Sequence, residues 1–135
     1  MHLTAITFLA LFIAATQSTD EIDLSKKTPG EIIDYYIESK PIVVFSKSTC
    51  PYCKKAKKAL ATFKLDECDF EFVDLDKHKE LDLKKFQDEF QVRYGTRTVP
   101  KVFIDGQLIG GGDDTVAMLK NGTLAVLVKE AIECE

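Results

Sequence analysis

Residues 42–76 hold two short apolar runs with an amphipathic stretch between them, and this succession limits the fold more than any other part of the chain. The run IVVFSK at 42–47 is typical of a strand buried on both faces of a sheet. FEFVDLD at 70–76 is a second candidate strand, and a lysine-rich helix is predicted between them at about 51–64. A strand–helix–strand unit of this length requires parallel strands joined by a right-handed crossover.

Two further helices are predicted on either side of this unit. The first begins after Thr28, because Pro29 suits the first helical position and Glu31 completes a capping box with Thr28. The second covers about 78–94, where large apolar residues recur at helical spacing. Both helices are long enough to cover a face of the predicted sheet.

The C-terminal part predicts a β-hairpin followed by two helices. KVFIDGQLIG at 101–110 has two apolar runs around Asp105-Gly106, a dipeptide that suits a two-residue type I′ turn. A short helix is expected from about residue 113, and Asn121-Gly122 separates it from a last amphipathic helix. The order αβαβαββαα predicts an α/β fold with a mixed four-stranded sheet flanked by helices.

The length of 135 residues indicates one domain, which we place at 28–135. The net charge of -4 is too mild to imply a partner, and no basic run indicates nucleic acid. Four cysteines are too few for a disulfide scaffold.

The N-terminus differs in composition from the rest of the chain. Residues 3–18 carry no charged side chain, and their apolar centre at 5–15 is shorter than the roughly 20 residues that span a bilayer. We interpret 1–18 as a secretory signal peptide, with an uncleaved membrane anchor or a buried helix as alternatives, and 19–27 as a flexible lead-in. The predicted location is therefore the secretory pathway (endoplasmic reticulum or Golgi) or outside the cell, and the NGT triplet at 121–123 is an N-glycosylation acceptor.

The CPYC stretch is the strongest candidate for chemistry. Cys50 falls where the first strand ends and a helix begins, and Pro51 supports that placement. A side chain at a helix start faces unpaired N–H groups and the positive end of the helix dipole, and lysines lie on both sides. Such surroundings lower a thiol pKa from about 8.5 to roughly 3.5–7.5. Cys50 is thus predicted to attack, and Cys53, one helical turn further on, to resolve the mixed disulfide.

Two structural alternatives exist for this pair. A zinc site needs two more ligands, and the remaining candidates form no second tight pair: Cys68, Cys134, His78 and His2. A purely structural disulfide would close a very small loop and would constrain the unfolded chain little. Cys68 and Cys134 themselves could be free, joined to each other or bonded to another molecule, and the sequence does not decide among these.

Three motifs together resemble the dithiol glutaredoxins, a family with the thioredoxin fold. They are CPYC at 50–53, TVP at 98–100 and GGGDD at 110–114, and the likeness covers roughly 28–133. The resemblance implies a monomeric glutathione-dependent thiol–disulfide oxidoreductase that acts on glutathionylated or disulfide-bonded proteins. Glutathione is then a co-substrate, and no metal or organic cofactor is expected.

The resemblance also implies a glutathione site. Tyr52 would lean over the peptide, and three side chains would lie near its glycine carboxylate: Lys47, Gln87 and Arg97. The backbone of Val99 would pair with the cysteinyl unit as an added strand does, with a cis bond before Pro100. Thr98, next to Val99, would also contact glutathione. The γ-glutamyl end would be received by Gly111, Gly112, Asp113 and Asp114, with the Asp114 carboxylate facing the α-amino group.

Each of these residues also has a structural interpretation. Gln87, Arg97 and Tyr52 could be ordinary surface side chains, and the two aspartates could be helix caps, a role expected mainly for Asp113. Gly112 replaces a cysteine or polar residue of some family members, with little expected effect. Two other functions remain as alternatives: a general protein disulfide oxidase or isomerase, and a module that holds a glutathione-ligated [2Fe–2S] cluster, against which Pro51 argues.

Overall fold

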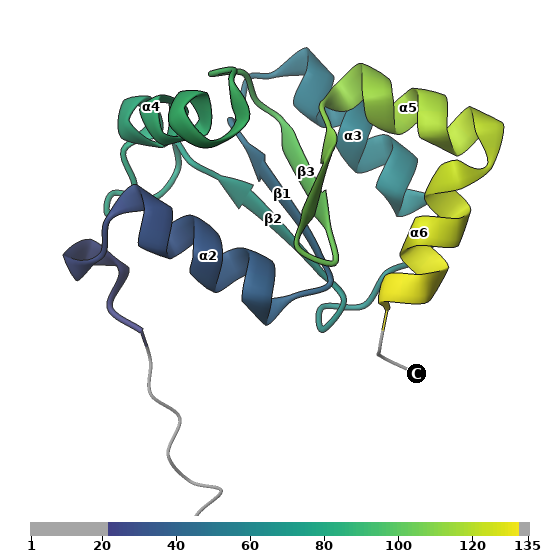
Figure 1. Cartoon of the computed structure of the whole chain (residues 1–135), viewed down its shortest axis with the longest axis horizontal. Helices are drawn as coiled ribbons and strands as arrows, with labels where there is room; N and C mark the ends of the chain where they lie inside the picture. The colour runs from purple at the N-terminus through teal and green to yellow at the C-terminus, as the bar shows by residue number, and fades with distance from the viewer. Residues whose placement is uncertain (1–21, 133–135) are drawn as a thin grey trace, which may run out of the picture.

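The computed structural model describes residues 22–132, so the predicted signal peptide at 1–18 and Cys134 lie outside the described residues. A four-stranded sheet lies between two helical layers, and α2 and α4 cover one face while α3, α5 and α6 cover the other (Figure 1). The elements in chain order are η1 (Leu24–Lys26), α2 (Pro29–Ser39), β1 (Ile42–Ser46), α3 (Pro51–Ala61), β2 (Phe70–Asp74), α4 (Leu83–Tyr94), β3 (Lys101–Ile104), β4 (Gln107–Gly110), α5 (Gly112–Asn121) and α6 (Thr123–Ala131).

The sheet has the strand order β2-β1-β3-β4. β1 pairs in parallel with β2 and antiparallel with β3, which confirms the predicted mixed sheet. β3 and β4 form the predicted hairpin, and its turn residues Asp105 and Gly106 both have positive φ values, 52° and 77°, as a type I′ turn requires. The fold is therefore thioredoxin-like, as expected.

β1 supplies the core on both faces of the sheet because successive side chains of a strand point to opposite faces. Val43 and Phe45 pack toward α2 and α4, whereas Ile42 and Val44 pack toward α3 and α6. Every residue of β1 is buried, in agreement with its continuous apolar sequence. This central strand ends four residues before Cys50, so the core fixes where the redox pair emerges.

Several predicted boundaries need correction. The helix expected at 78–94 begins only at Leu83, because the Asp82 side chain accepts the backbone N–H of Lys85 at 3.2 Å and caps it there. The helix expected to reach residue 64 ends at Ala61, where the Thr62 hydroxyl donates to the Ala59 carbonyl and the chain turns. Both strands of the parallel pair are also shorter than predicted, at 42–46 and 70–74.

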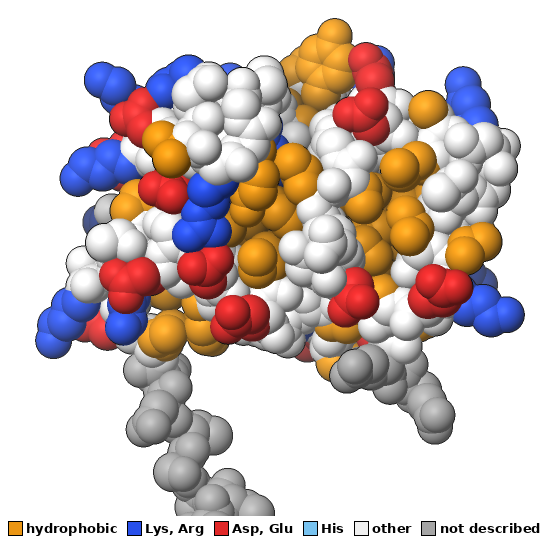
Figure 2. All heavy atoms as spheres, viewed as in Figure 1, with side chains coloured by type: hydrophobic (Ala, Val, Ile, Leu, Met, Phe, Trp, Pro, Cys, Tyr) orange, Lys and Arg blue, Asp and Glu red, His pale blue; other side chains and the backbone are white. Residues whose placement is uncertain are grey.

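The lead-in contains a single-turn 3₁₀ helix, η1, that the sequence did not indicate. Asp23 is its N-cap residue, and the Asp23 carboxylate accepts hydrogen bonds from the backbone N–H and the hydroxyl of Ser25. Figure 2 shows apolar side chains on either side of the β3–β4 hairpin and acidic side chains along the lower part of this face.

Within residues 22–132, no helix has the length and apolar character needed to cross a bilayer.

Phe45 is expected to be a principal stabilising side chain, since its ring contacts those of Tyr36, Phe86, Phe90 and Phe103 and is fully buried. Phe45→Ala should lower the free energy of unfolding by about 3–5 kcal/mol through lost burial and an unfilled cavity. Urea unfolding followed by circular dichroism measures this.

Val92→Ala is the matched control, because Val92 is 81% exposed and its truncation should change stability by no more than about 0.5 kcal/mol. Equal effects of the two variants would contradict the assignment of the core.

Candidate functional site

The two cysteines lie at the start of α3 and are joined by a disulfide bond. Cys50 is the N-cap residue, and its Sγ accepts the backbone N–H of Cys53 at 3.1 Å. Pro51 occupies the first helical position, as predicted. Cys50 and Cys53 are 4% and 1% exposed, so the two sulfurs differ in their position on the helix more than in their burial. The helix-start placement of Cys50 is confirmed.

A cavity of about 270 Å³ lies beside Cys50 and collects residues from three distant segments. The Cys50 Sγ is 3.6 Å from the carbonyl oxygen of Val99, and Val99 also lines the cavity. The bond between Val99 and Pro100 is cis, in agreement with the prediction. Eight of the predicted site residues line this cavity: Tyr52, Thr98, Val99, Pro100, Gly111, Gly112, Asp113 and Asp114.

Glycine at 112 is what allows α5 to approach the CPYC turn. A Cβ at this position would lie 2.3 Å from the carbonyl oxygen of Tyr52, closer than any real contact. The expectation that glycine here has little effect is therefore wrong for this chain. At Gly111 the nearest atom to a Cβ would be the Pro100 carbonyl oxygen at 3.6 Å, which is an ordinary contact.

The aspartate that caps α5 is not the one expected. The Asp114 carboxylate accepts the backbone N–H of Gly111 at 2.9 Å, so Asp114, and not Asp113, caps the helix start. Asp113 instead pairs with Lys55 of α3, with 3.2 Å between its Oδ1 and the Lys55 Nζ. Both carboxylates lie at the positive end of the α5 dipole, where negative charge is favoured.

The other three predicted residues do not line the cavity. Lys47 is half-buried in the loop after β1, and Gln87 is half-buried on α4. Arg97 forms an ion pair with Asp88, and this pairing holds the pKa of the Asp88 carboxyl below its usual range. Arg97 is thus tied to α4 in this state.

Sequence reasoning missed Asp76, which supports the loop that carries Cys50. Its carboxylate accepts the backbone N–H of Ser48 at 2.9 Å and the Ser48 hydroxyl at 2.5 Å, and these bonds lower the Asp76 pKa. A signal was present, because Asp76 follows β2 and Ser48 follows β1, and parallel strands end at the same edge of a sheet.

Lys101 was also missed, and it holds the loop on the other side of the cavity. It is 3% exposed, and its Nζ donates to the Thr96 hydroxyl at 2.8 Å and to the carbonyl and hydroxyl oxygens of Thr98 at 2.6 and 3.1 Å. Burial lowers the Lys101 pKa. Alternation could have revealed this placement, because Lys101 lies on the same face of β3 as the core residue Phe103.

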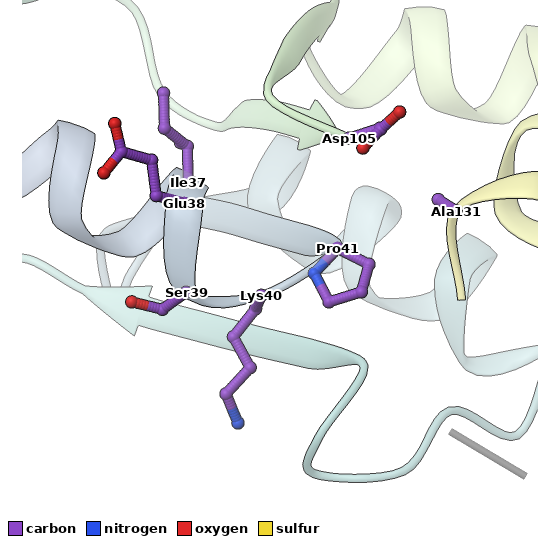
Figure 3. A pocket seen from close by; sticks show the side chains of 7 residues that line it. All are labelled: Ile37, Glu38, Ser39, Lys40, Pro41, Asp105 and Ala131. Carbon is purple, nitrogen blue, oxygen red and sulfur yellow. The ribbon is translucent and has the colours of Figure 1, made fainter. Parts of the chain in front are cut away.

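Another cavity and a possible metal grouping lie apart from this site. The cavity in Figure 3, about 130 Å³, lies where α2 leads into β1 and is lined by Pro41 and Asp105, at the opposite end of β1 from Cys50. Within residues 22–132, the side chains placed to share a metal ion are Asp66, Cys68 and Asp69, and this group does not include the redox pair. Of the other zinc candidates, Cys68 is the one in this group, whereas Cys134 and His2 lie outside the described residues.

Comparison with known proteins decides the family. The glutaredoxin family model matches residues 42–109. The chain belongs to the glutaredoxin family. Glutaredoxin-C4 of Arabidopsis thaliana is 41% identical over 123 residues, which cover 91% of this chain and 81% of that protein. Glutaredoxin-1 of Oryctolagus cuniculus is 38% identical over 100 residues, or 74% of this chain and 92% of the relative.

Solved glutaredoxin structures agree with this assignment. A wheat glutaredoxin superimposes with a TM-score of 0.69 at 38% identity, over 78% of this chain and 97% of that one. A buckwheat glutaredoxin–glutathione complex gives a TM-score of 0.67 at 30% identity, over 86% of this chain and 100% of the other. This glutaredoxin is accordingly a glutathione-dependent thiol–disulfide oxidoreductase, and Cys50 and Cys53 are its disulfide-forming pair.

Gly112→Ala should destabilise the protein by about 1–3 kcal/mol, because the new methyl group must displace the Tyr52 peptide. Gly111→Ala is the matched control: its φ of -102° suits any residue, so stability should stay within about 1 kcal/mol of the original. Thermal and urea unfolding of both variants test the close approach, and similar losses would refute it.

Proposed function

We propose that the cavity beside Cys50 binds the glutathione part of a mixed disulfide. The observation that supports this most is the convergence of Tyr52, Val99 and Gly111 on the side of Cys50 that faces the cavity. The Val99 backbone would pair with the cysteinyl unit as an added strand, and the N-terminus of α5 would receive the γ-glutamyl carboxylate.

In this proposal the Asp114 carboxylate serves two partners. It already accepts a hydrogen bond from the Gly111 N–H. A carboxylate has several lone pairs, so the same group can also accept a hydrogen bond from the α-amino group of glutathione. Lys47 and Gln87 would meet the glycine carboxylate at the other end of the tripeptide, with Arg97 joining them after it leaves Asp88. A planar guanidinium can pair with a carboxylate through two parallel hydrogen bonds.

The reaction follows from the position of Cys50. The ionised Cys50 sulfur attacks the glutathione sulfur of a glutathionylated protein, so that the Cys50–glutathione bond forms and the protein leaves as a thiolate. A second glutathione thiolate then attacks this bond, which yields oxidised glutathione and restores the Cys50 thiolate. The Cys53 N–H donates a hydrogen bond to the Cys50 sulfur in both of these steps. This bond stabilises negative charge on the sulfur whenever Cys50 attacks or leaves.

For a protein disulfide, Cys53 completes the reaction. Cys50 first forms a mixed disulfide with one protein sulfur, and Cys53 then displaces that protein by forming the Cys50–Cys53 bond. Two glutathione molecules reduce this bond in turn. We propose no resident cofactor and a monomeric enzyme. Pro51 after the first cysteine is the feature that argues against a [2Fe–2S] module.

The roles of Cys50 and Cys53 can be tested by comparing the kinetics of the original protein with those of two single variants. With a small glutathione mixed disulfide as substrate, Cys50→Ser should fall to the background rate because the attacking sulfur is gone. Cys53→Ser should keep much of the original rate, since the glutathione route does not use Cys53. The measurement is oxidised glutathione formed per second in a coupled assay, and equal losses in both variants would overturn the proposal.

A general disulfide oxidase or isomerase would behave differently. Replacing Lys47 and Asp114 with Ala should raise the KM for the small glutathione substrate severalfold if the proposed site is right. If the protein is instead a general oxidase, the same variants should keep their full activity on a peptide disulfide that contains no glutathione. Assays of both variants with both substrates therefore separate these functions.

We also propose that the protein enters the secretory pathway through residues 1–18. The sequence pattern supports this, and Asn121 gives a reporter for it because it lies exposed at the corner between α5 and α6, with its Oδ1 accepting the Thr123 N–H at 2.9 Å. The α5 helix separates this corner from the redox pair, so a glycan there would leave the site open (Figure 1).

Expression of the full chain in secreting animal cells tests the location. The expected product begins after a cut near residues 15–19. Glycosidase treatment should lower the mass of this product, whereas it should leave the mass of the Asn121→Gln variant unchanged. A product that keeps Met1, carries no glycan and fractionates with cytosolic proteins would contradict the proposed location.

A further inference from the structure

The positive charge of this chain is concentrated in one segment. Residues 39–65 contain seven lysines and neither Asp nor Glu, whereas the rest of the chain contains 11 basic and 22 acidic residues. This strong asymmetry within a mildly acidic protein creates a local positive field. The family's two cysteines lie inside the segment, so the field surrounds the place where a substrate must arrive.

The structure gathers this charge on the exposed side of α3. Lys54, Lys57 and Lys58 are all exposed, and within residues 22–132 no ion pair with a carboxylate is formed by any of them. Lys57 instead lies over the ring of Phe72, 4.9 Å from its centroid. These ammonium groups are therefore available to carboxylates of a partner.

Apolar troughs run along both sides of this lysine ridge. The trough between α3 and α5, about 250 Å³, is lined by Lys55, Lys58, Ala59, Thr62, Val116 and Leu119. The trough on the β2 side, also about 250 Å³, is lined by Lys57, Leu60, Ala61, Lys64, Leu65 and Phe70. Each trough thus has an apolar floor and a rim of lysines, which suits an apolar side chain with an acidic neighbour.

The ridge is continuous with the proposed glutathione cavity. Lys55 pairs with Asp113, which lines that cavity, and its Nζ lies 4.9 Å from the ring centroid of Tyr52, which lines it as well. α3 and α5 lie side by side from this point onward (Figure 1). A protein whose sulfur has reached Cys50 must therefore rest its flanking chain against this surface.

We propose that the α3 ridge and its two troughs form the docking surface for protein substrates and select acidic segments with apolar side chains near the reactive cysteine. The proposal rests on the proposed function and adds its substrate class. Opposite charge on the substrate increases the rate of encounter, and the apolar side chain prolongs contact within a trough. A polypeptide fits the observations better than a membrane does, because the troughs are separate and of side-chain size, and the one between α3 and α5 reaches the site through Lys55.

The test compares glutathionylated peptides that differ only in the residues around one cysteine: Glu and Leu, Lys and Leu, or Ser alone. For the original protein, kcat/KM should favour the acidic peptide over the basic one by about tenfold at low salt, and the ratio should shrink as salt is raised. A small glutathione mixed disulfide serves as the substrate that does not touch the ridge.

Two matched variants locate the effect. Lys57→Glu with Lys58→Glu reverses two adjacent lysines of the ridge, and Lys84→Glu with Lys85→Glu makes the same change on α4, which covers the other face of the sheet. The ridge variant should lose or invert the preference. The preference is a ratio of kcat/KM values for two peptides on the same variant, so any effect of the lost lysine charge on the Cys50 sulfur cancels. The α4 variant should keep the preference.

The trough between α3 and α5 has its own variant. Val116→Thr keeps the volume of the side chain but adds a hydroxyl to the apolar floor. It should lower kcat/KM for the leucine-bearing acidic peptide and leave an otherwise identical peptide without leucine unchanged.

Three results would count against the inference. Equal kcat/KM for acidic and basic peptides, or equal loss in the two lysine variants, would overturn it while leaving the proposed function intact. Binding to phosphatidylserine vesicles at physiological salt without any peptide preference would assign the ridge to a membrane instead. Failure of the original protein to turn over even the small disulfide would overturn the proposed function itself.

Discussion

The hydrogen bond from the Cys53 backbone N–H to the Cys50 sulfur is the central interaction of the site. The other elements of the structure serve to place this sulfur and the residues around it. A sulfur can occupy this position only where a strand stops and a helix starts within a few residues, and the buried strand β1 sets that point. In the proposed reaction this bond stabilises negative charge on the Cys50 sulfur, together with the positive end of the α3 dipole.

Two loops must be held near this sulfur, and each is held by a buried or hydrogen-bonded polar side chain. Lys101 fixes the loop before β3, and Asp76 fixes the loop before α3. A third segment, the start of α5, comes close because Gly112 has no side chain to meet Tyr52. The cavity therefore depends on the Gly112–Tyr52 approach within its lining and on Lys101 and Asp76, which hold two loops beside it.

Much of the fold could be predicted, and the errors have local causes. The parallel strand–helix–strand unit, the hairpin turn at Asp105-Gly106 and the capping box at Thr28 follow from patterns among near neighbours in the chain. The start of α4 was misplaced because apolar spacing continues upstream of Asp82, whose capping bond depends on one side-chain orientation. The capping role was assigned to Asp113 instead of Asp114 because adjacent acidic residues look equivalent in a sequence.

The sequence by itself determined the succession of elements, the family motifs and the place of Cys50 at a helix start, because periodicity and capping act between near neighbours in the chain. Tertiary structure alone decided that α5 meets the CPYC turn at Gly112 and that the α3 lysines border apolar troughs. These features join segments tens of residues apart, and their distances are set by how the helices pack on the sheet.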